Sequence, residues 1–187
     1  MSKNLLVVLL LVVGMRAAGQ VVSPEIKKGT TVNYNFHLHG QTARFTLSFE
    51  NVTDSLKLKW GIRYLAGGTY IITPRAWQDA VGLNWVQPEA SKVVQLPDDQ
   101  TFCMLSKNAF HELVTNHRFT YNNTVYNFVN DAKTNALMMG DQQVDALHVK
   151  AEGDTTEFWV LNNPSFPLLL KVKNNPLGID VDLISVK

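Results

Sequence analysis

The sequence has a single cysteine and almost no surplus charge. Cys103 has no second cysteine with which to form an internal disulfide, so the fold must be stabilised by its core. The 17 basic and 16 acidic residues nearly cancel, whereas proteins that bind nucleic acid or an anionic membrane surface depend on clustered Lys and Arg. We therefore expect no nucleic-acid partner.

Motifs for catalysis are also missing. No serine lies in a Gly-x-Ser-x-Gly elbow, and there is no Gly-x-Gly-x-x-Gly or Gly-Lys-Ser/Thr phosphate loop. Cys103 lies in an apolar segment, 101–105, which favours a buried thiol over a reactive one. Asp180 and Asp182 could form a paired carboxylate, or they could be the hydrated side of a strand. Nothing in the sequence argues for an enzyme, and no cofactor is expected.

No apolar run reaches the roughly 20 residues that span a bilayer, but a shorter run near the amino terminus has another meaning. Lys3 precedes the apolar segment 5–13, and Ala17-Ala18-Gly19 follows it. This order is typical of a secretory signal peptide, and we interpret residues 1–19 as that peptide. Residues 20–187 then form one β-rich domain, secreted or periplasmic, without a membrane span. Loss of Lys3 and Arg16 changes its net charge from +1 to −1.

Two-residue alternation is abundant in what remains. In segments 32–38, 43–49 and 56–64, apolar side chains alternate with polar ones, as on strands with one buried and one hydrated face. Short turn segments separate the three runs, which predicts an antiparallel meander. Further strands are predicted over 92–95, 118–121, 124–128, 143–151, 155–161, 168–172 and 179–186.

Two short helices interrupt the strands. Thr73-Pro74 can start one that runs to Ala80, and Ser106 can cap another over 107–115, whose apolar residues form one stripe. The sequence therefore predicts a mainly β fold, a β-dominated α+β domain, with a curved antiparallel sheet or partly open barrel and one or two short helices. The helix over 107–115 could plug the concave side of the sheet.

Large aromatic residues recur on the apolar side of the predicted meander. Such a face is either an ordinary core or the wall of a pocket, and a strongly curved sheet can leave apolar volume for a lipid or another apolar small molecule. The candidate ligand-binding residues on this face are Tyr34, Phe36, Phe45, Phe49, Trp60 and Tyr64.

Two histidines form the one candidate metal site. On a strand, His37 and His39 would project from the same side and could reach one zinc or copper ion. A third ligand would be needed, and the spacing of the other histidines does not supply it. The alternative is that both imidazoles belong to the hydrated face, which the alternation predicts directly.

The closing segment resembles a known family. Residues 158–171, which begin Phe-Trp-Val-Leu-Asn-Asn-Pro, and residues 178–186 resemble the end of exported bacterial domains of unknown function of the DUF3108 type. Residues 29–34 are similarly placed to the opening strand of such domains. The resemblance implies an architecture like that of envelope lipoprotein carriers, in which a tryptophan strand, a proline turn and two final strands end a curved sheet. It also implies a periplasmic location.

These observations lead to three hypotheses. The first is an exported, noncatalytic β domain that binds an apolar ligand or an envelope component on the concave face of its sheet, with Trp159 of the late strand added to the binding residues. The second is a structural or protein-interaction module of the cell envelope with a filled core. The third is a metal-dependent hydrolase that uses His37 and His39.

Overall fold

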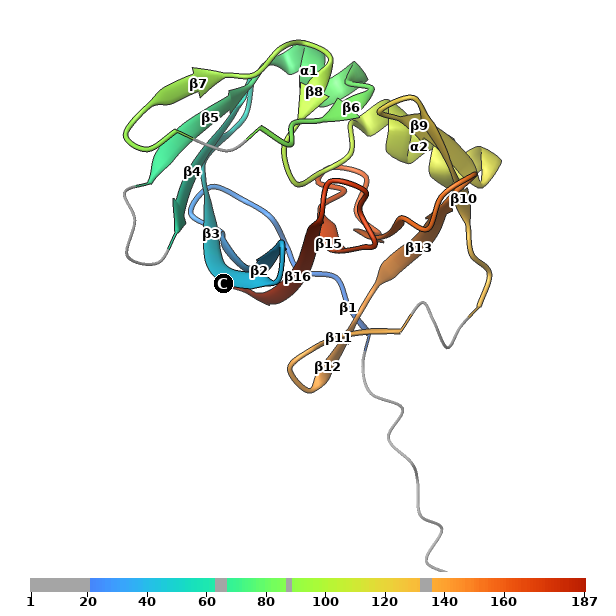
Figure 1. Ribbon diagram of the computed structural model, residues 1–187. Helices are drawn as coiled ribbons and strands as arrows, with labels where there is room; N and C mark the ends of the chain where they lie inside the picture. Colours follow the sequence, from blue (N-terminus) through green and yellow to red (C-terminus); the bar gives the residue numbers. More distant parts are fainter. Residues whose placement is uncertain (1–20, 63–66, 87–88, 132–135) are drawn as a thin grey trace, which may run out of the picture.

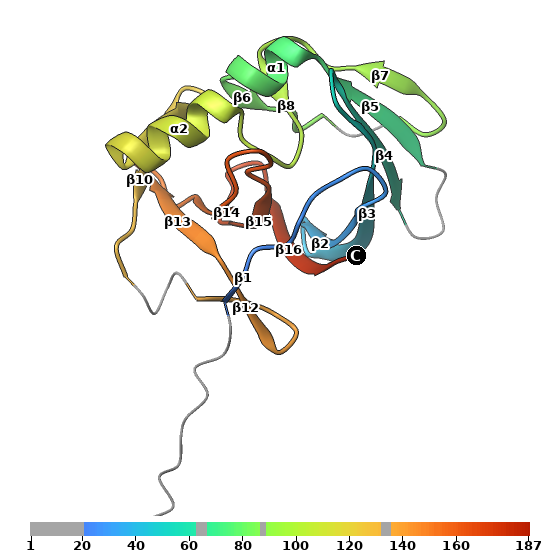
Figure 2. The same ribbon diagram turned by 180° about the vertical axis from the view of Figure 1, so that it is seen from behind.

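Most of the chain forms one strongly curved sheet. The computed structural model describes residues 21–62, 67–86, 89–131 and 136–187, so the expected signal peptide and Tyr64 lie outside the described residues. Strands account for 52% of the structure and helices for 10%. The sheet does not close into a barrel, and two helices lie across its open side (Figures 1 and 2). The predicted mainly β fold with a curved antiparallel sheet is confirmed.

The large sheet contains eleven strands in the order β7-β5-β4-β3-β2-β16-β15-β14-β13-β10-β9. Neighbouring strands are antiparallel except at one edge, where β7 is parallel to β5. The strands are β2 (Thr31–Leu38), β3 (Gln41–Val52), β4 (Leu56–Ile62), β5 (Gly68–Ile72), β7 (Val93–Gln95), β9 (Arg118–Tyr121), β10 (Thr124–Phe128), β13 (Ala146–Ala151), β14 (Glu157–Leu161), β15 (Leu169–Lys173) and β16 (Ile179–Val186).

Two small sheets flank the large one. One has the order β1-β12-β11, and in the other β6 is parallel to β8. The single strand predicted over 143–151 is wrong, because Asp145 separates β12 from β13. Its backbone N–H donates to Val22 and its carbonyl accepts from Asn162, so the chain bends from one sheet to the other here. The five strands are β1 (Val21–Val22), β6 (Gly82–Leu83), β8 (Gln100–Thr101), β11 (Leu137–Met139) and β12 (Gln142–Val144).

Strand register explains why the alternating residues share a face. Tyr34 on β2 is opposite Phe45 on β3, and Leu47 on β3 is opposite Trp60 on β4. Opposed residues project to the same side of a sheet, so these apolar side chains form one continuous buried surface. The last strand, β16, pairs with β2 on one side and β15 on the other, and it thereby joins the amino-terminal meander to the carboxy-terminal hairpins.

Both predicted helices are present with the expected caps. Helix α1 (Pro74–Asp79) begins after Thr73, whose Oγ1 accepts from the Ala76 backbone N–H at 3.0 Å. Helix α2 (Lys107–Asn116) begins after Ser106, whose Oγ accepts from the Ala109 N–H at 3.2 Å. In the described part of the chain, neither these helices nor any other has the length and apolar character needed to cross a bilayer.

A segment before α2, and not α2 itself, covers the inner face of the meander. Helix α2 packs against β9 and α1, so it covers the β9 end of the open side and does not reach the meander. Phe102 covers the meander instead: its ring centroid lies 5.7 Å from that of Phe45 and 4.8 Å from that of Tyr70. Pairing of Met104 with Leu168 and a hydrogen bond from the Leu169 N–H to the Cys103 carbonyl hold this segment on the sheet.

Candidate functional site

An apolar pocket of about 340 Å³ opens at one end of the inner face of the sheet. Strands β2, β3, β4 and β16 form one wall, and the loop after β6 together with Phe102 forms the other. Leu38 and Val86 are 36% and 71% exposed. The pocket is lined by Phe36, Leu38, His39, Ala43, Phe45, Ile62, Asn84, Trp85, Val86, Phe102 and Ile179.

The space exists because a small residue is opposite a large one. Ala43 on β3 pairs in register with Phe36 on β2, and both project inward. The Phe36 ring packs against Phe45 with 4.7 Å between centroids, and Phe45 stacks on Trp60 at 6.1 Å. These contacts form a continuous aromatic floor, and the methyl group of Ala43 leaves the volume above it unfilled. A larger side chain at position 43 would project into the pocket.

The opposite wall comes from residues that the sequence analysis did not select. Trp85 and Val86 follow β6, and Asn84 fixes their position: its Oδ1 accepts from the Val86 N–H, and its Nδ2 donates to Gln100, both at 3.0 Å. Phe102 follows β8. Neither segment has strand or helix periodicity, so an apolar composition was the only signal that could have drawn attention to them.

The pocket continues inward past its aromatic lining. A cavity of about 10 Å³ shares Phe36, Asn84, Trp85 and Phe102 with the pocket and extends to Cys103 and Leu169. Its volume is at the lower limit of what a single water molecule requires, so in this conformation the inner space is too small for a ligand.

The predicted meander residues divide between the pocket and the core beneath it. Phe36 and Phe45 line the pocket, whereas Tyr34, Phe49 and Trp60 are buried in the core. Tyr64 lies outside the described residues. Phe49 packs edge-on against Phe166 at 5.9 Å, away from the pocket lining. The meander therefore contributes part of a wall, and its deeper aromatic residues support that wall.

The expectation that Trp159 shares this surface is wrong. Trp159 pairs in register with Lys171 and His148, whereas the neighbouring Phe158 pairs with Val172, which belongs to the inner face. Alternation therefore places Trp159 on the outer side of the sheet. Its indole stacks on the His148 ring with 4.1 Å between centroids and is 7% exposed.

The two candidate metal-binding histidines lie on opposite sides of the sheet. His37 is on the outer face, where Nδ1 is 2.9 Å from Thr42 Oγ1 and Nε2 is 3.2 Å from Asp182 Oδ2. His39 follows the end of β2 and lines the pocket on the inner side. The i, i+2 argument fails because β2 ends at Leu38. Within the described residues, no three His, Cys, Asp or Glu side chains are grouped to hold a metal ion.

The candidate acidic pair on β16 takes part in structural contacts. The Asp182 carboxylate bonds with His37 and lies 2.6 Å from Lys171 Nζ. The Asp180 carboxylate accepts from the Asn175 backbone N–H at 3.3 Å. Asp180 and Asp182 therefore interact with different groups, as expected of the hydrated side of a strand.

Cys103 is buried, as its apolar surroundings indicated, and burial raises the pKa of its thiol. Its backbone has a φ of 54°, a left-handed conformation that is uncommon for residues other than glycine. The bend at this residue turns Phe102 toward the meander and Met104 toward Leu168. Cys103 is therefore a packing residue at the inner end of the pocket.

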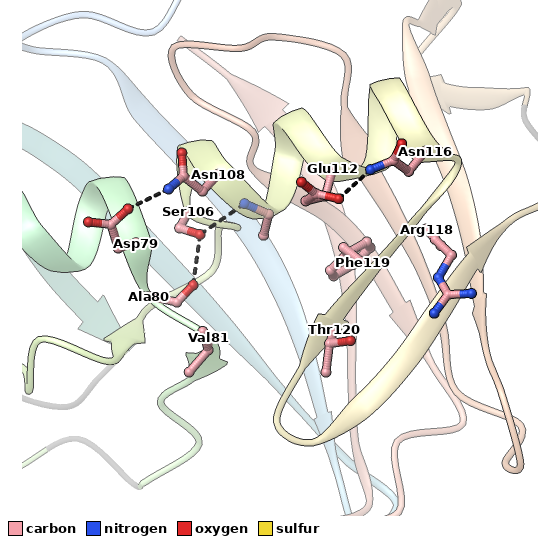
Figure 3. Close-up of a pocket in the computed structure, with 11 residues that line it drawn as sticks. Asp79, Ala80, Val81, Ser106, Asn108, Glu112, Asn116, Arg118, Phe119 and Thr120 are labelled. Carbon is pink, nitrogen blue, oxygen red and sulfur yellow. Dashed lines mark hydrogen bonds between the residues drawn. The ribbon is translucent and has the colours of Figure 1, made fainter.

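A second hollow, of about 500 Å³, lies between the end of α1, helix α2 and β9 (Figure 3). Its polar groups bond with one another: Asn108 Nδ2 donates to Asp79, Asn116 Nδ2 donates to Glu112, and Ser106 Oγ donates to the Ala80 carbonyl at 2.7 Å. Ser106 is fully buried and caps α2, so it is not available as a nucleophile. The bonds of Asn108 and Ser106 connect the two helices, whereas the bond between Asn116 and Glu112 lies within α2.

Comparison of the chain with models of known families, with characterised proteins and with solved structures finds no match.

Proposed function

We propose that this protein is an exported, noncatalytic binding domain that takes an apolar ligand into the pocket above Phe36 and Phe45. The observation that carries the proposal is the composition of that pocket: of the eleven described residues that line it, nine are aliphatic or aromatic, the exceptions being His39 and Asn84. Ligand pockets of a few hundred Å³ with mainly apolar walls and a few polar groups are typical of small-molecule sites.

The energetics favour a flexible aliphatic ligand. Each methylene group transferred from water to the pocket contributes about 0.8 kcal/mol, so each added methylene should increase affinity by roughly fourfold until the pocket is full. Exposed apolar side chains at Leu38 and Val86 extend the apolar surface to the mouth. A chain entering here would meet aliphatic and aromatic surface along its length.

The proposed location outside the cytoplasm depends on the sequence. The charged, apolar and small-residue order of residues 1–19 supports export, and so does the resemblance of the closing strands to exported DUF3108-type domains. Amino-terminal sequencing of the protein recovered from the periplasm or medium tests this part: a chain beginning at Gln20 is expected. An uncleaved chain confined to the cytoplasm would contradict it.

Filling the pocket tests ligand binding. In Ala43→Phe the new ring should occupy the space above Phe36 and weaken binding of N-phenyl-1-naphthylamine, an uncharged dye that fluoresces in apolar surroundings, by at least about tenfold. Thr42→Phe is the matched control, because Thr42 is the preceding residue on the same strand and is exposed on the outer face. It should bind the dye within about twofold of the wild-type value.

Circular dichroism should show that both variants are folded, and Ala43→Leu replaces Ala43→Phe if the larger side chain prevents folding. Equal dye affinity in the wild-type protein and a folded position-43 variant would show that the dye binds elsewhere and would overturn the proposal. Failure of the wild-type protein to bind either the dye or aliphatic chains would do the same.

A second candidate is an interaction module of the envelope, and the edges of the large sheet favour it. Strand β7 ends the sheet order on one side, and Val93 on it is 66% exposed. Backbone groups at such an edge can pair with a strand of another chain. Native mass spectrometry separates the candidates: copurified small molecules support ligand binding, whereas a clean mass and a stable oligomer support the interaction module.

A further inference from the structure

His39 occupies a turn position that its side chain does not favour. The β2–β3 hairpin is closed by His39 and Gly40, which have φ values of 48° and 83°. Two-residue hairpin turns with positive φ at both positions prefer Asn-Gly, Asp-Gly or Gly-Gly. A histidine here costs conformational energy relative to asparagine, and residues held in unfavoured backbone conformations cluster at functional sites.

The turn places His39 at the pocket, and Gly178 holds it there. The His39 N–H donates to the Gly178 carbonyl at 3.2 Å. The imidazole lies against the Cα of Gly178, where an added Cβ would be 2.8 Å from Nδ1. Gly178 has a φ of 68°. The absence of a side chain at position 178 therefore makes room for the His39 ring beside the pocket.

His39 is also the lining residue whose polar group is free to meet a ligand. Among the described residues its imidazole has no hydrogen-bond partner, whereas the Asn84 amide is already bonded to Gln100 and Val86. The other uncommitted polar group among the described residues of the lining is the indole N–H of Trp85, which can only donate. None of these described lining residues is Asp, Glu, Lys or Arg, and the nearby Asp180 carboxylate is on the outer face, bonded to Asn175.

We propose that His39 contacts the polar head of the ligand and that the ligand is a single-chain amphiphile with an anionic head, such as a carboxylate. This inference depends on the proposed function. Both free polar groups of the lining are hydrogen-bond donors, and the His39 imidazole can also carry a positive charge, which suits an anion. A cationic head would meet no carboxylate among the described residues that line the pocket.

The pocket volume limits the length of the chain. If each methylene takes up about the 30 Å³ that a water molecule occupies in the liquid, the pocket accommodates on the order of ten carbons. The aliphatic chain would lie over Phe36 and Phe45, with its far end toward Phe102. Decanoate and dodecanoate are therefore suitable probes, with dodecylammonium as the probe of opposite charge.

Displacement of N-phenyl-1-naphthylamine by these compounds tests the inference. Dodecanoate should displace the dye from the wild-type protein at a concentration at least about tenfold lower than dodecylammonium. His39→Asn should weaken dodecanoate by about tenfold and should weaken the uncharged dye by a smaller factor than dodecanoate. His37→Asn is the matched control, because His37 is two residues away on the outer face, and it should change neither value.

Two additional measurements keep the test decisive. Val86→Asp adds a carboxylate at an exposed position of the mouth, and it should weaken dodecanoate by a larger factor than it weakens the uncharged dye. His39→Asn should unfold at a higher urea concentration than the wild-type protein, because asparagine is preferred in this turn. Equal affinity for dodecanoate and dodecylammonium, or undiminished dodecanoate binding in His39→Asn, would overturn the inference while dye binding left the proposed function intact. Absence of dye binding would overturn the proposed function itself.

Discussion

The hydroxyl groups of Thr101 and Tyr121 lie 2.8 Å apart inside the core. Thr101 Oγ1 donates to the Met104 carbonyl at 2.5 Å, and the Tyr121 oxygen accepts from the Ser106 N–H at 3.1 Å. Through these bonds β9 holds both ends of the segment that carries Phe102 over the meander. The position of the inner pocket wall therefore depends on this buried chain of hydrogen bonds.

Tyr121→Phe should destabilise the fold. The substitution removes the oxygen that accepts from the buried Ser106 N–H and bonds with the Thr101 hydroxyl. Such losses lower the free energy of unfolding by about 1–3 kcal/mol. Urea denaturation followed by circular dichroism measures the change. A variant as stable as the wild-type protein would show that other groups satisfy Ser106 and Thr101.

Tyr34→Phe should have the opposite effect. Tyr34 is as completely buried as Tyr121, but its hydroxyl has no hydrogen-bond partner among the residues that the structure describes. Removing an unpaired buried hydroxyl eliminates a desolvation penalty, so we expect the free energy of unfolding to rise by about 1 kcal/mol. The same urea experiment measures it, and a marked loss of stability would show that this hydroxyl forms a favourable interaction.

The Cys103 thiol should not react in the native protein. The thiol is buried, so a reagent cannot reach it. Burial also raises the pKa of the thiol, so little of the reactive thiolate forms. Ellman's reagent at pH 8 should label almost no thiol in buffer and one thiol per chain in 6 M guanidinium chloride. Rapid labelling without denaturant would mean that the inner end of the pocket opens readily.

Alkaline pH should unfold the protein as its tyrosines ionise. Burial raises the pKa of Tyr34, Tyr70, Tyr121 and Tyr126 above the ordinary value of about 10, and that of Tyr70 reaches about 12. Because the folded state favours the neutral phenols, their contribution to stability is complete below about pH 10 and is lost as the pH rises further.

Absorbance at 295 nm should show tyrosine ionisation displaced to higher pH in the native protein than in guanidinium chloride. This expectation concerns four of the five tyrosines, because Tyr64 lies outside the described residues. Ionisation of several phenols near pH 10 with an unchanged circular dichroism spectrum would contradict the prediction.

Local patterns were sufficient to predict most strands and both helices. Alternation predicted the meander because one face of each strand is buried and the other hydrated, and Thr73 and Ser106 identified the helix starts through their capping oxygens. The bend at Asp145 could not be predicted in this way. It depends on backbone bonds to Val22 and Asn162, which are distant in the sequence.

The candidate site was only partly predictable for the same reason. Phe36 and Phe45 were recognised from alternation on their own strands, but Trp85 and Phe102 reach the pocket from irregular segments whose position depends on tertiary contacts. Trp159 was assigned to the wrong face of the sheet. Which residues of β14 share a face with those of β2 depends on the register of the strands between them, and the sequence pattern of β14 alone does not determine that register. The position of His39 at the pocket could not be predicted from alternation, because it depends on the end of β2 at Leu38.

The position of β16 has a consequence for folding. Residues 179–186 follow every other strand of the large sheet along the chain, yet they lie between β2 and β15 near the middle of that sheet. Until β16 is in place, the amino-terminal meander and the carboxy-terminal hairpins have no strand to connect them, and Ile179 is missing from the pocket wall. The pocket should therefore form only when both halves of the sheet have joined through β16.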